Sequence, residues 1–404
     1  MVDAAGEVFD ARSVLRARFA VSCGFFVFGF GFAVWAVHIP VVAARLGLDP
    51  AILGLALLNV GLGGVISQPI TGWGIAQTGS RQAATVLLPL FLSVFIVPIV
   101  AWSTPVFFVG TIILGVTFGS ANVALNTQAS EIEIARRRPT MSSFHGFASL
   151  GGLAGASIGG GIIAVGWQDG SGAAIVAMIL LAVAGVAAQY FLPTRPTRRS
   201  ASQEGRGRLA LSAPVLALAV LAFFANSVEG GVNDWSALYL ATVRGLSTAT
   251  AASGFAVFSF GMAICRLAGG RAVVRLGERR VVLFGGALVA VGMAVVVLSP
   301  WAVVSPFGYA LVAFGEANAI PVMMGAAARA PGVAPSAGVA ATATGALLAF
   351  SRRPARDRVH RPRDEFEPGA RIAEPVGRCG HGRRGSLSLA GAGRAIRSLI
   401  YVMQ

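Results

Sequence analysis

The sequence predicts an all-α integral membrane protein built from two six-helix halves, with the second half incomplete. Only 12% of the residues are charged, whereas an average globular chain is about a quarter charged. Apolar residues make up 55% of the chain. They form long continuous runs, which favours helices over a β-barrel, whose strands alternate apolar and polar residues. At about 20 residues for each span, the runs present predict ten to eleven transmembrane helices.

Ten apolar runs are long enough to cross a bilayer, and an eleventh is short. The predicted spans are 19–44, 51–75, 83–101, 105–128, 141–165, 171–192, 212–241, 248–270, 281–299 and 302–326. The eleventh run, 336–350, has 15 residues and is expected to be at most partly inserted. Within the fifth span, Gly151, Gly155 and Gly159 are four residues apart, a spacing that lets another helix approach closely.

Polar connections divide the chain into five segments. We predict a cytoplasmic N-terminus (1–18), a six-helix half (19–192), a basic cytoplasmic linker (193–211), an incomplete second half (212–350) and an arginine-rich tail (351–404). The tail holds 12 arginines against 5 acidic residues. Two interpretations of the tail stay open. One is a disordered segment that binds anionic lipid heads, and the other is a diverged reading frame, because GC-rich codons read out of frame give Arg, Pro, Gly and Ala.

The net charge of +15 comes from arginine alone, and its placement predicts the topology. With the N-terminus inside, 18 of the 20 arginines before residue 351 lie on the inner side. The positive-inside rule therefore predicts a multi-pass protein of the inner or plasma membrane with a cytoplasmic N-terminus, and we exclude nucleic-acid binding. Cys23, Cys265 and Cys379 form no pairing or metal-binding pattern, so neither a disulfide nor a metal is expected.

The two groups of spans repeat weakly. Gly119-Ser120-Ala121-Asn122 recurs 196 residues later as Gly315-Glu316-Ala317-Asn318. Trp35 and Gly54 find counterparts 200 residues later, at Trp235 and Gly254. A period near half of a twelve-helix protein indicates two parallel halves related by an axis along the membrane normal.

Three motifs make the chain resemble the major facilitator superfamily, and within it the fucose-permease-like branch of sugar and small-solute transporters. The motifs are ANVALNTQ at 121–128, MSSFH at 141–145, and Glu229 followed by NDWSALYL at 233–240. The resemblance covers about residues 20 to 350. It implies a substrate site near the bilayer midplane between two halves that open alternately to either side.

The connection between the second and third spans departs from the superfamily pattern. Gly72, Gly79 and Arg81 keep the expected spacing, but Ala76 stands where an acidic residue is usual. In the second half Arg271 and Arg275 remain, while Gly270 and Val274 replace the usual acids. The resemblance implies that these loops gate the inner side, and the missing acids predict a weaker latch.

Polar side chains inside apolar spans are the candidate site residues. Asn122 and Asn126 are four residues apart and share a helix face, where they either bond neighbouring helices or line a cavity. Glu229 and Asn233 have the same spacing in the seventh span. A carboxylate within an apolar span costs about 2.5–3.5 kcal/mol on insertion scales, so Glu229 is expected either to couple transport to protons or to meet water at the outer mouth.

The tenth span carries the most deeply placed acid. Glu316 precedes Asn318 and Pro321, a proline that predicts a kink. We expect Glu316 to bind substrate or protons, or to pair with an arginine such as Arg266. Near the inner end of the fifth span, His145 either relays protons or is a packing residue.

We therefore predict a secondary transporter of a small polar, sugar-like solute, with proton coupling, that acts as a monomer without a cofactor. The substrate-binding candidates are Trp35, Asn122, Asn126, Asn233, Glu316 and Asn318, and the proton-coupling candidates are Glu229, Glu316 and His145. The absence of a Walker pattern, an HExxH motif and a nucleophile elbow argues against an ATP-driven pump or an enzyme. Two alternatives remain, a multidrug exporter of the same superfamily and a non-functional truncated product.

Overall fold

The structure, a computed structural model, describes residues 10–193, 212–246 and 248–351. The predicted linker from residue 194 onward, the tail from residue 352 onward and Cys379 lie outside the described residues. Within them every regular element is a helix. The first half contains α1 (Ala11–Leu46), α2 (Pro50–Thr78), α3 (Ser80–Val94), α4 (Thr104–Arg136), α5 (Met141–Ala164) and α6 (Ser171–Ala188). The second contains α8 (Ala213–Thr242), α9 (Thr248–Leu276), α10 (Glu278–Leu298), the short 3₁₀ helix η1 (Ala302–Val304), α11 (Ser305–Glu316), α12 (Ala319–Ala328) and α13 (Pro335–Ser351).

The helices confirm the predicted all-α membrane fold. In the part of the chain that the structure describes, nine helical segments are long and apolar enough to cross a membrane, and α3 is a shorter apolar helix. Three helices extend six or more residues beyond their predicted spans. Helix α1 begins at Ala11 instead of residue 19, α4 continues to Arg136 instead of ending near residue 128, and α9 continues to Leu276 instead of residue 270. Charged residues at a helix end remain compatible with helical backbone, and hydropathy alone does not register them.

The predicted tenth span is interrupted. Helix α11 ends at Glu316 and α12 begins at Ala319, so the break lies at Ala317 and Asn318. The kink expected from Pro321 is thus present, one turn before the proline. Helix α13 has 17 residues and packs against α2 and α8, inside the bundle.

Equivalent contacts confirm the internal repeat. At the end of α1, Arg45 Nη2 donates to the Ala101 carbonyl at 3.0 Å, and also to that of Ile99. Near the end of α8, Arg244 Nη2 donates to the Ser299 carbonyl at 2.5 Å. Arg45 and Arg244 are thus equivalent arginines that bond the backbone after the third helix of their own half.

The glycine spacing in α5 also acts as predicted. A Cβ atom on Gly151 would lie 2.0 Å from the Phe26 carbonyl oxygen, and one on Gly155 would lie 2.3 Å from that of Phe30. Real Cβ atoms do not come so close, so α1 and α5 pack backbone to backbone. This contact is the most extensive one in the first half.

Among the described residues, one helix position that is filled in the first half has no counterpart in the second. Helix α6 packs against both α1 and α3. The equivalent helices α8 and α10 have no such partner among residues 212–246 and 248–351. Large apolar side chains on these two helices, including Phe224, Leu283 and Phe284, are exposed.

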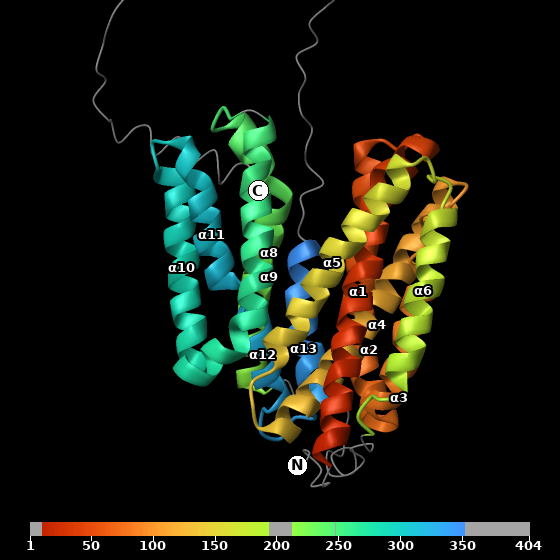
Figure 1. Cartoon of the computed structure of the whole chain (residues 1–404), viewed down its shortest axis with the longest axis vertical. Coiled ribbons are helices and arrows are strands. Elements are labelled where there is room, and N and C mark those ends of the chain that lie inside the picture. Colours follow the sequence, from red (N-terminus) through yellow and green to blue (C-terminus); the bar gives the residue numbers. More distant parts are fainter. Residues whose placement is uncertain (1–9, 194–211, 247, 352–404) are drawn as a thin grey trace, which may run out of the picture. The chain divides into compact units, whose positions relative to one another are not determined.

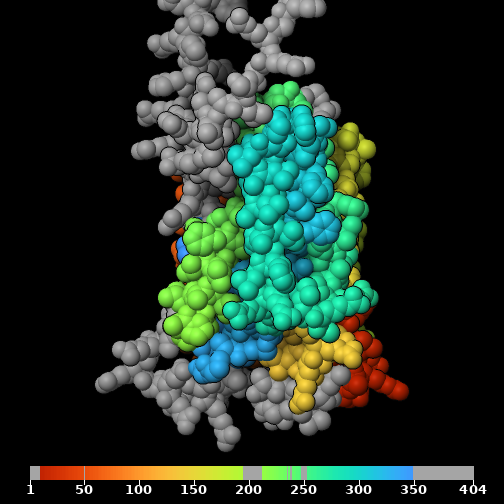
Figure 2. Space-filling view, turned by 90° about the vertical axis from the view of Figure 1, so that its left-hand side faces the viewer, coloured from red at the N-terminus to blue at the C-terminus, as the bar shows by residue number. Residues whose placement is uncertain are grey.

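One end of the bundle gathers the arginine-bearing connections. The α2–α3, α4–α5, α9–α10 and α12–α13 connections lie at the same end as the start of α1 (Figure 1). We name it the arginine-rich end after Arg136–Arg138 and Arg279–Arg280. Figure 2 shows the face formed by α9 and α10, with the blue α12–α13 region beside the gold α4–α5 region at this end. The two halves therefore meet there.

Candidate functional site

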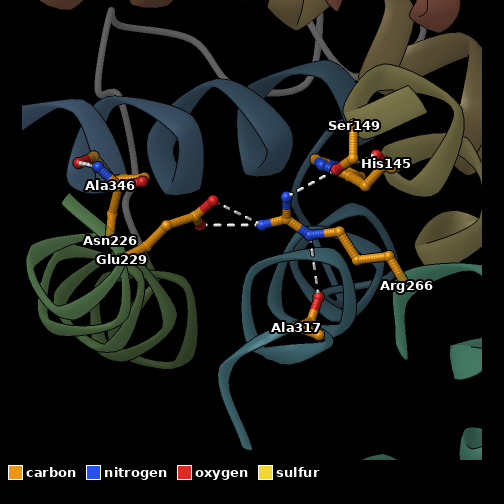
Figure 3. Close-up of polar contacts among 7 residues, drawn as sticks. All are labelled: His145, Ser149, Asn226, Glu229, Arg266, Ala317 and Ala346. Carbon is orange, nitrogen blue, oxygen red and sulfur yellow. Dashed lines mark hydrogen bonds and ion pairs between the residues drawn. The ribbon is translucent and has the colours of Figure 1, made fainter. Parts of the chain in front are cut away.

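Arg266 of α9 is the centre of a polar cluster between the two halves (Figure 3). Its Nη2 atom lies 3.0 and 2.8 Å from the two carboxylate oxygens of Glu229 on α8. Its Nη1 atom donates to the Ser149 hydroxyl on α5 at 3.0 Å, and its Nε atom donates to the Ala317 carbonyl at 3.3 Å. One guanidinium thus joins a carboxylate, a hydroxyl of the other half and the break in the tenth span.

The cluster is largely withdrawn from solvent. The side chains of Arg266 and Glu229 are only 13% and 19% exposed. A charge-assisted pair in such a place has strong directional hydrogen bonds, because the surroundings screen it less than water does. Sequence reasoning counted Arg266 among the arginines of the inner side and mentioned it as a possible partner of Glu316. Its actual partner is Glu229, which depends on how α8 packs against α9.

A second carboxyl, that of Glu316, belongs to the residue before Ala317, whose carbonyl bonds Arg266. Glu316 is 4% exposed. Its Oε1 atom is buried, and no hydrogen bond reaches it from the described residues. Two carboxyls against one guanidinium leave a charge of −1 when both are ionised, so these three side chains carry no net charge only when one carboxyl holds a proton.

His145 joins the predicted amide pair on the first-half side of the cluster. Its Nε2 atom lies 3.0 Å from the Asn126 Oδ1 atom. The Asn126 amide donates to the Asn122 side-chain oxygen at 3.3 Å, which confirms that the two asparagines share a face. The imidazole also packs 5.4 Å from the Phe25 ring.

One hydroxyl connects the imidazole helix to Arg266. Ser149 donates to the His145 carbonyl oxygen at 3.2 Å and accepts from Arg266. The polar residues of the two halves therefore meet at Ser149. Sequence reasoning missed it, although a serine four residues after a candidate histidine shares that residue's helix face.

Asn318 occupies the break itself. Its Nδ2 atom donates to the Cys265 carbonyl oxygen at 3.4 Å, while no described residue donates to its buried Oδ1 atom. A Cβ atom on Gly269 would lie 1.8 Å from that oxygen, so only glycine fits opposite Asn318. Asn318 directly follows Ala317, a member of the Arg266 cluster, and its side-chain amide is held against α9.

Other candidate residues lie elsewhere. Trp35 is 1% exposed and packs against Phe107 at 6.0 Å within the first half, and Asn233 is exposed.

Of the gating candidates, Arg81 bonds the Gln189 carbonyl oxygen of its own half. Arg271 and Arg275 are exposed, and Gly79 has a φ of 87° at the α2–α3 junction. Gly72 lies at the contact between halves, because a Cβ there would be 2.7 Å from the Ala340 Cβ atom of α13.

An ion pair that sequence reasoning missed joins the halves at the arginine-rich end. Arg329 Nη1 lies 2.5 Å from Glu133 Oε1, and Arg329 Nη2 also pairs with Glu278. The second Glu133 oxygen accepts from the backbone N–H groups of Thr140 and Met141, at 2.6 and 2.7 Å, where α5 begins. Residues 133 and 329 are 196 apart, which is the repeat offset, and this offset is the signal that would have found the pair.

The site offers hydrogen-bonding and charged groups rather than metal ligands. Within the described ranges no group of three or more His, Cys, Asp or Glu side chains could hold a metal ion. What the arrangement can do chemically is exchange partners. A proton or a polar solute can replace one of the contacts around Arg266.

Comparisons with known proteins agree with the fold and narrow the class. A family model described as Major Facilitator Superfamily matches residues 21–352. An uncharacterized MFS-type transporter of Yersinia pestis is 34% identical over 311 residues, covering 75% of this chain and 78% of the relative.

Solved structures of two transporters have a similar fold. The Escherichia coli fucose:proton symporter FucP gives a TM-score of 0.60 at 14% identity, covering 82% of this chain and 89% of that one. The human organic anion transporter MFSD10 gives 0.62 at 18% identity, covering 84% and 91%. At such identities the likeness extends to the fold alone.

Proposed function

Since the chain belongs to the Major Facilitator Superfamily, and is therefore a membrane transporter rather than an enzyme, we propose that it carries a small polar, sugar-like solute together with protons. The observation that carries the proposal is the Arg266 cluster, in which the guanidinium pairs with Glu229 and bonds the carbonyl of Ala317, the residue next to the buried Glu316. The fucose:proton symporter among the similar folds supports the same class.

Proton coupling follows from the charge count of the cluster. When Glu229 and Glu316 are both ionised, the cluster has one uncompensated negative charge in an apolar span, which is costly. Binding of one proton removes that charge. We propose that Glu229 releases Arg266 when it is protonated, and that Glu316 holds a proton while it is buried.

The polar groups beside the cluster supply the solute-binding capacity. Asn126 and His145 present an amide and an imidazole on the first-half side, and Asn318 presents a buried Oδ1 atom on the second-half side. Hydroxyl-rich solutes need such mixed donors and acceptors. We propose that the solute binds between these residues, with His145 relaying protons as predicted from the sequence.

Alternating access is supported by where the halves touch. The Glu133–Arg329 pair closes the arginine-rich end, and the Arg266–Ser149 bond lies deeper. On the other side of that bond, away from the arginine-rich end, large side chains of both halves are exposed. Leu153, one turn beyond Ser149 on α5, is 64% exposed, and Phe260 on α9 is 68% exposed. We propose that the arginine-rich end is cytoplasmic in the plasma membrane, that it is closed in this state, and that the protein works as a monomer.

Uptake in whole cells tests the proposal. Cells that express the chain receive radiolabelled fucose at acidic outside pH, and the pH of the unbuffered medium is followed. We expect saturable uptake with alkalinisation of the medium, and loss of both in Glu229→Gln and Glu316→Gln. Asp169→Asn, which changes an exposed carboxyl away from the cluster and keeps the oxygen that bonds Ser171, is the matched control with normal uptake.

Other outcomes would replace the proposed substrate. Uptake of an organic anion without fucose uptake would favour an anionic solute, for which Arg266 and the fold of the organic anion transporter are the relevant observations. Extrusion of a cationic dye would favour the multidrug exporter. Absence of the protein from the membrane, with rapid proteolysis, would favour a non-functional product.

A further inference from the structure

We infer that Pro321 is a positioning residue for Arg266. It withholds a backbone N–H and so leaves the Ala317 carbonyl oxygen as an acceptor for the guanidinium. The inference rests on the proposed role of Arg266 in transport. It assigns a function to the break in the tenth span, which the proposed mechanism otherwise leaves unused.

The backbone around the break shows which carbonyl is left over. In an α-helix each carbonyl accepts from the N–H four residues later. For Ala317 that residue is Pro321, which has no N–H to donate. Helical bonding stops at Ala317 N, which donates to the Ala313 oxygen, and resumes at Val322 N, which donates to the Asn318 oxygen, both at 3.1 Å. The break therefore spans one turn, and among the carbonyls released there, that of Ala317 is the one whose helical donor the proline removes.

Arg266 supplies the missing donor from the adjacent helix. Its Nε atom lies 3.3 Å from the Ala317 oxygen, and Ala317 is 0% exposed. A buried carbonyl without a donor is costly, so this bond satisfies a group that the proline creates. Because the guanidinium is planar, fixing Nε also fixes the directions of the two Nη atoms. These directions lead to Ser149 and Glu229.

The three contacts of Arg266 differ in what must happen when the halves separate. Glu229 and Ala317 belong to the same half as Arg266, whereas Ser149 belongs to the other. Only the Ser149 bond has to break. Pro321 thus provides a second anchor within the half, so that Arg266 keeps its orientation toward Glu229 in both states.

Substitution of the proline tests the inference. Pro321→Ala restores the N–H, which then occupies the Ala317 carbonyl within the helix and deprives Arg266 of an acceptor. Loss of a hydrogen bond to a charged group predicts about a tenfold rise in the KM for fucose, with a smaller change in the maximal rate. Pro89→Ala, which removes a proline inside α3, is the matched control with an unchanged KM.

A stability measurement tests the same contact without transport. Thermal unfolding is measured in detergent for Pro321→Ala, Arg266→Lys and the double variant. Lysine has no Nε–H at that position, so Pro321→Ala should destabilise the chain more in the Arg266 background than in the Arg266→Lys background. Equal effects in both backgrounds, together with an unchanged KM, would overturn the inference.

The two measurements also separate this inference from the proposed function. If the natural sequence takes up no fucose, the sugar proposal fails, and the stability cycle alone decides the role of Pro321. If fucose is taken up but the cycle shows no coupling and the KM is unchanged, the transport proposal stands and the role of Pro321 is refuted.

Discussion

Glu133 and Arg329 stand at equivalent positions of the two halves, 196 residues apart, and their side chains form an ion pair at 2.5 Å. Residues related by a two-fold axis meet only where they lie near that axis. Identical charges would repel there, whereas opposite charges hold the halves together. This pair closes the end where Ala76 replaces the acid expected from the superfamily pattern.

We predict that the Glu133–Arg329 pair stabilises the closed arrangement more than the Arg329–Glu278 pair does. Glu133 is 7% exposed and Glu278 is 39% exposed, so solvent screens the second pair more. Glu133→Gln keeps an oxygen for the start of α5 but removes the charge. A double-mutant cycle with Arg329→Gln should give a coupling of about 1–2 kcal/mol in chemical unfolding. The corresponding cycle with Glu278→Gln should give less, and equal coupling would contradict the prediction.

The backbone contact between α1 and α5 predicts a sharp difference between neighbouring glycines. Gly151→Ala places a methyl group 2.0 Å from the Phe26 oxygen and should lower stability by about 1–3 kcal/mol or more. Gly152→Ala is the control, because the nearest atom is 4.0 Å away, and it should be neutral within about 0.5 kcal/mol. Unfolding of both variants in detergent measures the difference. Similar stability in the two would argue against the close packing.

The repeated arginines should have repeated effects. Arg45→Ala and Arg244→Ala each remove a donor from a backbone carbonyl, at an expected cost of about 0.5–1.5 kcal/mol each, because Arg45 is exposed and water competes for its bonds. They belong to different halves, so their effects on unfolding should add. Arg271→Ala, an exposed side chain with no hydrogen bond among the described residues, serves as the neutral reference. A loss of stability in only one of the two variants would show that the two arginines, although equivalent in position, do not contribute equally to the free energy of unfolding.

The Ser149 bond should influence movement between states more than the binding of solute. Ser149→Ala removes the hydroxyl that accepts from Arg266 Nη1. We expect a change in the maximal uptake rate with less change in KM, and recovery in Ser149→Thr. Ser157→Ala removes an exposed hydroxyl from the same helix and should leave both values unchanged. Initial-rate uptake over a range of solute concentrations distinguishes these results.

The sequence predicted those features of the fold that depend on local pattern. Long apolar runs indicated the helices, the glycine spacing in α5 indicated a close helix contact, and Pro321 indicated the kink. The shared face of Asn122 and Asn126 needs only the helical period, and the structure confirms it.

The missed features depend on contacts between distant helices. Arg266 pairs with Glu229 across 37 residues and Ser149 across 117, and no local period encodes such distances. Trp35 is an aromatic residue of the kind that often binds sugars, yet its ring packs against Phe107 within the first half. The Glu133–Arg329 pair could have been predicted only by comparing charged residues, as well as glycines, at the repeat offset.

The length of α13 has a consequence for the surrounding lipid. Seventeen residues of α-helix rise about 26 Å, whereas the hydrocarbon core of a typical bilayer is about 30 Å thick. Helix α13, which packs against α2 and α8, is therefore too short to reach across such a core, and α3 of the first half, with 15 residues, is shorter still. Each half thus combines a short helix with longer ones, of which α1 and α4 can match a thick bilayer by tilting. The acyl-chain length of the membrane should consequently act on the stability of both halves.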